Sequence, residues 1–115
     1  MSAAHYRLDN LVAIVDHNGL QIDGRNEDVM TVMPIGEKFA GFGWHVISID
    51  GHDFDQIRGA FAEARQTKDR PTAIIAETIK GKGVSFMENQ AGWHGKAPDE
   101  EQTAQALKEL KGEQA

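Results

Sequence analysis

The 115-residue chain contains no cysteine, so neither a disulfide framework nor a thiolate metal site is available to it. Its formal net charge of −6 argues against the basic surface that nucleic acids and acidic membranes require. No apolar run approaches the roughly 18 residues of a membrane span, and the N-terminus lacks a signal-peptide pattern. We therefore expect a cytoplasmic protein with no nucleic-acid or membrane partner. The length allows one small domain but not a complete multidomain enzyme.

Strand and helix signals alternate along the chain, which predicts an α/β fold with a parallel sheet. Segments 11–15, 45–50 and 72–79 are apolar in their centres and predict about three strands. The first of these, Leu11 to Val15, is apolar without alternation, as is typical of a strand buried on both faces. We expect a polar loop over residues 25–31.

Helices are predicted between and after these strands. Pro34 suits the start of a helix that glycines 41 and 43 stop. Asp53 is a candidate N-cap with Gln56 as its capping partner, and one face of that helix is apolar: Phe54, Ile57, Ala60, Phe61 and Ala64. The pattern then predicts an irregular loop over 84–97 and a C-terminal helix over 98–111, with Ala104, Leu107 and Leu110 on one face.

The polar residues after the first strand form the first candidate site. Ligands of open parallel sheets bind beyond the carboxyl ends of the strands, and Asp16-His17-Asn18-Gly19 stands at such an end. Asn18 offers a neutral oxygen, and the following backbone offers carbonyls, which suit Mg²⁺ or Ca²⁺ together with phosphates. A hairpin turned at Asn18-Gly19 is the alternative, favoured by these two residues alone. The short second arm, residues 20–22, counts against it.

Two further segments carry candidate site residues. Lys80-Gly81-Lys82-Gly83 follows the third strand and could cradle a phosphate, but no helix signal follows it as in a P-loop, and a solvated basic turn is the alternative. His94 lies in the later Trp93-His94-Gly95 segment, where a surface histidine in a loop is the alternative to a site residue. No spacing among the five histidines predicts a zinc site.

Nearly the whole chain resembles the transketolase family, most closely the N-terminal subunit of split bacterial transketolases. The resemblance rests on residues 16–24 (DHNGLQIDG), continues through Phe39 to Trp44 and Asp50-Gly51-His52-Asp53, and ends with 80–85 (KGKGVS) and 93–98 (WHGKAP). It implies that residues 1–115 are part of a thiamine diphosphate-binding domain. The implied reaction moves a two-carbon ketol unit from a ketose phosphate to an aldose phosphate, as in the pentose phosphate pathway, with thiamine diphosphate and Mg²⁺ (or Ca²⁺) as cofactors.

The resemblance also assigns roles to individual residues. Asn18 matches the family's metal ligand that touches the diphosphate, and Leu20 matches the residue whose backbone carbonyl binds the metal. His94 matches the histidine near the cofactor diphosphate and the donor sugar, and is therefore the candidate catalytic and substrate-binding residue. Lys80 is a weaker cofactor-binding candidate, because full-length members usually carry isoleucine there.

The resemblance further implies that the chain is incomplete. The family's Gly-Asp-Gly segment, which supplies the anionic metal ligand, has no counterpart here, and the glutamate that activates the cofactor belongs to a partner subunit. We therefore expect an inactive isolated chain whose partners are the N-terminal part of its own domain and a C-terminal transketolase subunit, in a homo- or hetero-oligomer. Two alternatives stay open: a fragment of an enzyme like deoxyxylulose-phosphate synthase, and a non-catalytic remnant or binding module.

Overall fold

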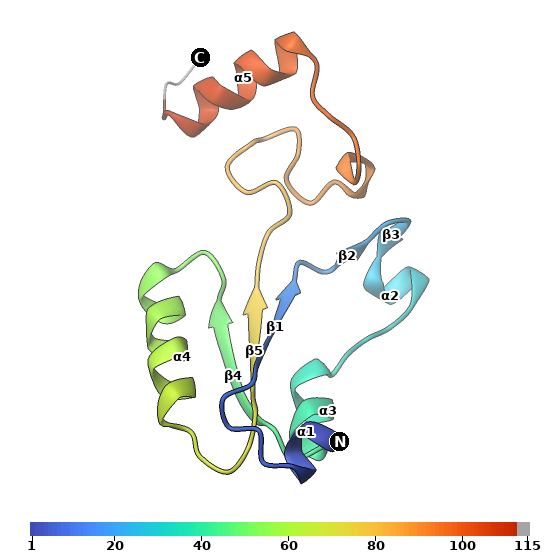
Figure 1. The fold of residues 1–115 in the computed structure, drawn as a ribbon. Helices are drawn as coiled ribbons and strands as arrows, with labels where there is room; N and C mark the ends of the chain where they lie inside the picture. The colour runs from blue at the N-terminus through green and yellow to red at the C-terminus, as the bar shows by residue number, and fades with distance from the viewer. Residues whose placement is uncertain (113–115) are drawn as a thin grey trace. The chain divides into compact units, whose positions relative to one another are not determined.

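The computed structural model describes residues 1–112 and divides them into two units. The first unit contains residues 1–17 and 32–78, and the second contains residues 18–31 and 79–112. The first unit holds a parallel sheet with helices, and the second holds a small hairpin, loops and the last helix (Figure 1). The α/β class and the three-stranded parallel sheet agree with the sequence prediction.

The sheet of the first unit has the order β1-β5-β4, and all its neighbours are parallel. The central strand β5 (Thr72–Glu77) lies between β1 (Val12–His17) and β4 (His45–Asp50). Its first five residues are all buried, because strands cover both of its edges and helices pack on the sheet. Ile74 is only 1% exposed, and it joins Ile49, Ala60 and Ala76 in the core.

The structure corrects the expectation that the first strand is buried on both faces. Strand β1 is an edge strand among the described residues, and its side chains alternate only partly between half-buried and exposed positions. Ile14 is 58% exposed, although it stands in register with the buried Ile74 of β5. The continuous apolar pattern therefore describes β5 correctly and overstates the burial of β1.

Helix α4 (Phe54–Gln66) is capped as the sequence predicts. The Asp53 carboxylate accepts hydrogen bonds from the backbone N–H groups of Asp55 at 2.8 Å and Gln56 at 3.1 Å. These bonds, with the backbone bond from Gln56 as the main cause, lower the pKa of Asp53. Ala60 and Ala64 are buried, but Phe54 is 80% exposed, so the first residue of the predicted apolar face is not covered. It is the first helical residue, and no described element covers it.

The remaining helices of the first unit are short. Helix α1 (Ser2–His5) opens the chain, and α3 (Ile35–Gly41) begins directly after Pro34, as expected. Gly43, with a φ of +85°, turns the chain away from α3 toward β4. No helix among residues 1–112 is long and apolar enough to cross a membrane.

The second unit contains elements that the sequence did not predict. Strand β2 (Leu20–Gln21) pairs antiparallel with β3 (Gly24–Arg25), so the hairpin turns at residues 22–23 and not at Asn18-Gly19. The expected polar loop over 25–31 contains helix α2 (Asn26–Val29). The irregular segment after Val84 includes a single 3₁₀ turn, η1 (Ala91–Trp93).

The C-terminal helix α5 (Glu100–Leu110) forms within the predicted range and carries a full capping box between Asp99 and Gln102. Its packed face differs from the expected one. Leu107 and Leu110 are 53% and 60% exposed, while Ala106 and Glu109 are half-buried. Glu109 accepts hydrogen bonds from the Ser85 backbone N–H at 2.6 Å and hydroxyl at 2.8 Å, and these contacts fix the orientation of the helix.

Candidate functional site

The carboxyl ends of β1 and β5 are joined by side-chain hydrogen bonds. His17 Nδ1 lies 2.7 Å from Glu77 Oε2, and the Thr78 hydroxyl donates to the Asp16 carboxylate. The Thr78 backbone N–H also donates to the His17 carbonyl at 3.1 Å. The last residues of the two strands are thus fixed to each other before the chain continues into the second unit.

Asn18 begins the second unit with a tight side-chain turn. Its Oδ1 accepts a hydrogen bond of 3.0 Å from the Leu20 backbone N–H, which holds the side-chain amide in one orientation. Gly19 has a φ of +71°, a conformation that side-chain-bearing residues rarely adopt, and its carbonyl accepts from the Asn26 N–H at 2.9 Å. Two hydrogen bonds, one to the Asn18 side chain and one to the Gly19 carbonyl, therefore hold the turn.

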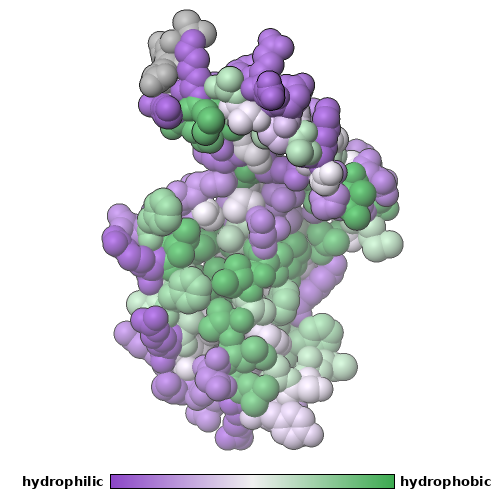
Figure 2. Space-filling model, turned by 45° about the horizontal axis from the view of Figure 1, so that its top comes forward, coloured by the Kyte–Doolittle hydropathy of each residue, from purple (hydrophilic) through white to green (hydrophobic). Residues whose placement is uncertain are grey.

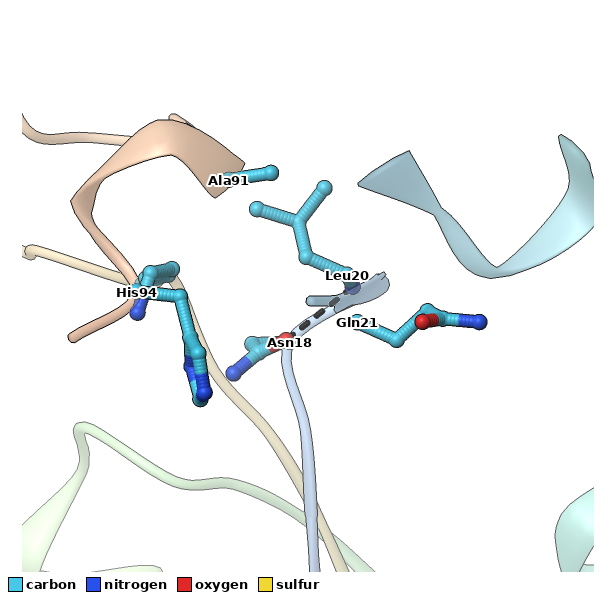
Figure 3. Close-up of a pocket in the computed structure, with 6 residues that line it drawn as sticks. Asn18, Leu20, Gln21, Ala91 and His94 are labelled. Carbon is cyan, nitrogen blue, oxygen red and sulfur yellow. Dashed lines mark hydrogen bonds between the residues drawn. The ribbon is translucent and has the colours of Figure 1, made fainter. Parts of the chain in front are cut away.

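A pocket of about 50 Å³ opens beside this turn (Figure 3). Figure 3 shows the Leu20 side chain rising toward Ala91, and the Gln21 side chain directed away from Asn18 and His94. All the residues that line the pocket belong to the second unit: Asn18, Leu20, Gln21, Lys80, Ala91 and His94. The four residues selected from the sequence thus lie together, although 76 positions separate Asn18 from His94.

Gln21 and Ala91 were not selected from the sequence. Gln21 follows Leu20 in the two-residue strand β2, and Ala91 begins η1 three residues before His94. Proximity in the chain to a candidate residue was the available signal for both. Their residue types gave none, because glutamine and alanine are common on any surface.

Lys80 is held at the start of a closed loop. Its carbonyl accepts a hydrogen bond from the Asn89 N–H at 3.0 Å, so the two ends of the loop 80–89 lie side by side. Gly81 has a φ of +71°, and a Cβ placed there would lie 2.7 Å from the Met87 carbonyl oxygen. The loop therefore requires glycine next to Lys80. Turns and no helix follow, which agrees with the expectation that this segment is not a P-loop.

His94 directly follows η1 and is placed by its neighbour Trp93. The Trp93 indole N–H donates to the Phe86 carbonyl at 2.9 Å, and the two aromatic rings lie 5.4 Å apart between centroids. The Lys96 ammonium, from two residues after His94, lies 4.6 Å from the Trp93 ring centroid. The tryptophan thus anchors the segment that carries the histidine.

The donors of this pocket suit an anion better than a bare metal ion. Lys80 supplies a cation and His94 an imidazole, and no carboxylate is among the lining residues. The pocket has several times the space that one water requires, so a phosphate group or a hydrated ion fits and a whole cofactor does not. The Asn18 amide and the Leu20 carbonyl are two neutral oxygens, and Mg²⁺ normally needs carboxylate or phosphate oxygens as well. The residues therefore fit a metal that arrives with its own phosphates.

Residues 1–112 contain no cluster of three or more His, Cys, Asp or Glu side chains that could hold a metal by itself. Two histidines outside the pocket form structural pairs with glutamates. His17 contacts Glu77, and His45 Nε2 lies 2.6 Å from Glu63 Oε1, where β4 meets α4.

The family model described as "Transketolase, thiamine diphosphate binding domain" matches residues 1–114. The chain belongs to the transketolase family. It is 42% identical over 115 residues to the 6-deoxy-6-sulfo-D-fructose transketolase subunit SqwG of a Clostridium species, covering all of this chain and 42% of that protein. It is 41% identical over 110 residues to an apulose-4-phosphate transketolase subunit of Phocaeicola vulgatus, covering 96% of this chain and 39% of that one.

Solved transketolase structures share this fold. A Pichia stipitis transketolase in complex with sedoheptulose 7-phosphate superimposes with a TM-score of 0.73 at 25% identity, over 97% of this chain and 20% of that one. The transketolase of Leishmania mexicana gives a TM-score of 0.68 at 25% identity, over 96% of this chain and 20% of that one. The chain spans less than half the length of the two curated relatives from Clostridium and Phocaeicola, as the coverages of 42% and 39% show.

Proposed function

We propose that this chain supplies the diphosphate-binding and metal-binding part of a transketolase that depends on thiamine diphosphate and Mg²⁺. The assembled enzyme would transfer a two-carbon ketol unit from a ketose phosphate, or a related ketose, to an aldose phosphate. One observation carries the proposal. In a chain of this family, Asn18, Leu20, Lys80 and His94 line a single pocket whose charge and donors suit a phosphate-bound metal.

Asn18 and Leu20 would hold the metal in this proposal. The Asn18 Oδ1 has a lone pair beyond the one that the Leu20 N–H occupies, and the Leu20 carbonyl adds a second neutral oxygen. Lys80 would neutralise a diphosphate oxygen that faces the pocket. A carboxylate from outside this chain would complete the near-octahedral set that Mg²⁺ demands.

His94 would contact both the cofactor diphosphate and the donor sugar. An imidazole can donate a proton to a hydroxyl or phosphate oxygen and accept one in turn near neutral pH. The bound cofactor would supply the carbanion chemistry of the two-carbon transfer, and this chain would supply binding and orientation. The anchoring of Trp93 to Phe86 limits how far His94 can move from that place.

Further polypeptide would have to complete the site and the sheet. The relatives named as transketolase subunits are more than twice as long as this chain. Strand β1 has a free edge among the described residues and exposes Ile14, and Figure 2 shows apolar residues gathered on one side of the sheet-containing unit. We propose that the remaining part of the domain pairs with this edge and that a C-terminal transketolase subunit joins the assembly.

Reconstitution tests the proposal. The chain is co-expressed with the N-terminal part of a related, longer subunit and with a C-terminal transketolase subunit, and two-carbon transfer is assayed with thiamine diphosphate and Mg²⁺. We expect activity in the complete assembly only. A complete, correctly assembled complex without transfer activity toward any ketose donor and aldose acceptor tried would contradict the proposed reaction.

A further inference from the structure

We infer that His17 and Glu77 are positioning residues for the pocket, acting on the two strand ends from which Asn18 and Lys80 follow. The inference rests on the proposed function, because it assigns a task to residues that do not themselves line the pocket. Strand β1 ends at His17, one residue before Asn18. Strand β5 ends at Glu77, three residues before Lys80.

The contacts between these strand ends are dense and specific. His17 and Glu77 are opposite each other in the parallel register, and the 2.7 Å contact between Nδ1 and Oε2 adds a side-chain link to that pairing. One residue further, the Thr78 N–H donates to the His17 carbonyl at 3.1 Å. The backbone ladder of β1 and β5 is thus extended up to the residue before Asn18.

The third strand packs against the same place. The Gly51 N–H donates to the Glu77 carbonyl at 2.8 Å, directly after β4. A Cβ on Gly51 would overlap Thr78 Cγ2, so Thr78 packs against Gly51 at a distance that only glycine allows. Glu77 and Thr78 are therefore held from both neighbouring strands, and His17 acquires a partner that cannot shift freely.

Global stability is a weak explanation for the His17 and Glu77 pair. The Glu77 side chain is 59% exposed, and exposed ion pairs contribute little to folding because water screens them. The effect of the pair on the neighbouring chain is different, because a contact at the end of a strand restricts the residues that come directly after it. Residues that orient a metal ligand from outside the coordination shell commonly change metal affinity about 10-fold or more when they are removed.

The chain contains a matched control for this pair. His45 and Glu63 form a second histidine–glutamate contact of 2.6 Å, with similar side-chain exposures of 23% and 55% against 14% and 59% for His17 and Glu77. His45 stands at the amino end of β4, away from the strand ends that lead to pocket residues. Removing either histidine should affect folding alike, while only His17 should affect the pocket.

The test uses the full 115-residue chain, isotopically labelled, with the Mn²⁺ complex of thiamine diphosphate as a paramagnetic probe. The probe is titrated into the millimolar range, and the concentration at which the Leu20 amide NMR signal is half broadened is measured. Thermal unfolding of each variant is recorded in parallel. The variants are His17→Ala, Glu77→Ala, His17→Gln, His45→Ala and Asn18→Ala.

We expect His17→Ala and Glu77→Ala to raise that concentration about 10-fold. His17→Gln should retain most of the affinity, because its side-chain N–H can still donate to Glu77. His45→Ala should bind the probe as the wild type does, and its unfolding temperature should be similar to that of His17→Ala. If His17→Ala broadens the signal at the same concentration as the wild type, or if His45→Ala weakens binding as much as His17→Ala does, the inference is wrong. A loss of binding in Asn18→Ala would still support the proposed function in that case. No broadening in the wild type, or full broadening in Asn18→Ala, would contradict both.

Discussion

The backbone N–H of Leu20 donates a hydrogen bond of 3.0 Å to the side-chain Oδ1 of Asn18. This contact holds the Asn18 amide beside the pocket and fixes the Gly19–Leu20 peptide group, which directly precedes the Leu20 carbonyl that we assign to the metal. The residue type at position 20 matters little for a backbone ligand, while asparagine at position 18 supplies both the turn and an oxygen.

Replacing Asn18 by alanine should abolish metal-dependent thiamine diphosphate binding in the assembled enzyme, since one metal oxygen and the turn that orients the other are lost together. Gln21→Ala is the matched control, because Gln21 lines the same pocket but its amide is directed away from Asn18 (Figure 3). Isothermal titration calorimetry measures both. Unchanged cofactor affinity in Asn18→Ala would contradict the assignment, and Leu20→Ile should bind as the wild type.

His94→Ala should lower kcat/KM of the assembled enzyme about 100-fold or more, as expected for the loss of a proton-transferring group. His5→Ala serves as the control, because His5 lies in helix α1 and contacts the Tyr6 ring. Steady-state kinetics are measured after analytical ultracentrifugation has shown intact assembly. Wild-type kinetics in His94→Ala would rule out its proposed role.

Gly51→Ala should destabilise the chain by about 1–3 kcal/mol, the usual cost of overpacking. The new Cβ would overlap Thr78 Cγ2 and would lie 3.1 Å from both the Ala76 Cβ and the Glu77 carbonyl oxygen. Gly59→Ala is the control: Gly59 lies in helix α4, its added Cβ would meet no atom within 4 Å beyond its chain neighbours and the nearby helix backbone, and the change should stabilise the helix by about 0.5–1 kcal/mol. Urea denaturation measures both, and equal effects would contradict the close packing of Gly51 on Thr78.

The attachment of α5 to Ser85 should weaken in acid. The backbone bond from Ser85, followed by the side-chain bonds from Gln105 and Ser85, lowers the pKa of Glu109. A lowered pKa means that the bonded carboxylate stabilises the folded form above the ordinary glutamate range and loses this effect as pH falls through the lowered value. The Ser85 amide chemical shift should follow this titration. In Glu109→Gln the shift should be independent of pH, and an unaltered titration there would refute the contact.

Local patterns were sufficient to predict the sheet and helix α4. The apolar segment at 45–50 forms β4, the first six residues of the segment at 72–79 form β5, and Asp53 caps α4 as its position before an amphipathic run indicates. Phe54 is exposed on the predicted face because helical periodicity says which residues share a face, while burial depends on whether another element covers the end of that face. The overstated burial of β1 has the same cause.

The unpredicted elements of the second unit depend on contacts that the local sequence does not show. Helix α2 is a single turn without apolar periodicity, and β2 and β3 are two residues each. The packed face of α5 is selected by the bonds between Glu109 and Ser85, which lie 24 residues apart. The roles of Asn18, Leu20, Lys80 and His94 were assigned through resemblance to a family. No spacing rule relates Asn18 to His94 across the chain.

The position of the metal tests the central claim most directly. The assembled enzyme is crystallised with thiamine diphosphate and Mn²⁺ in place of Mg²⁺, and the anomalous signal of manganese locates the ion. The account predicts one ion within coordination distance of the Asn18 Oδ1 and the Leu20 carbonyl oxygen, with the diphosphate beside Lys80 and His94. An ion bound to the diphosphate but outside the reach of Asn18 would contradict it.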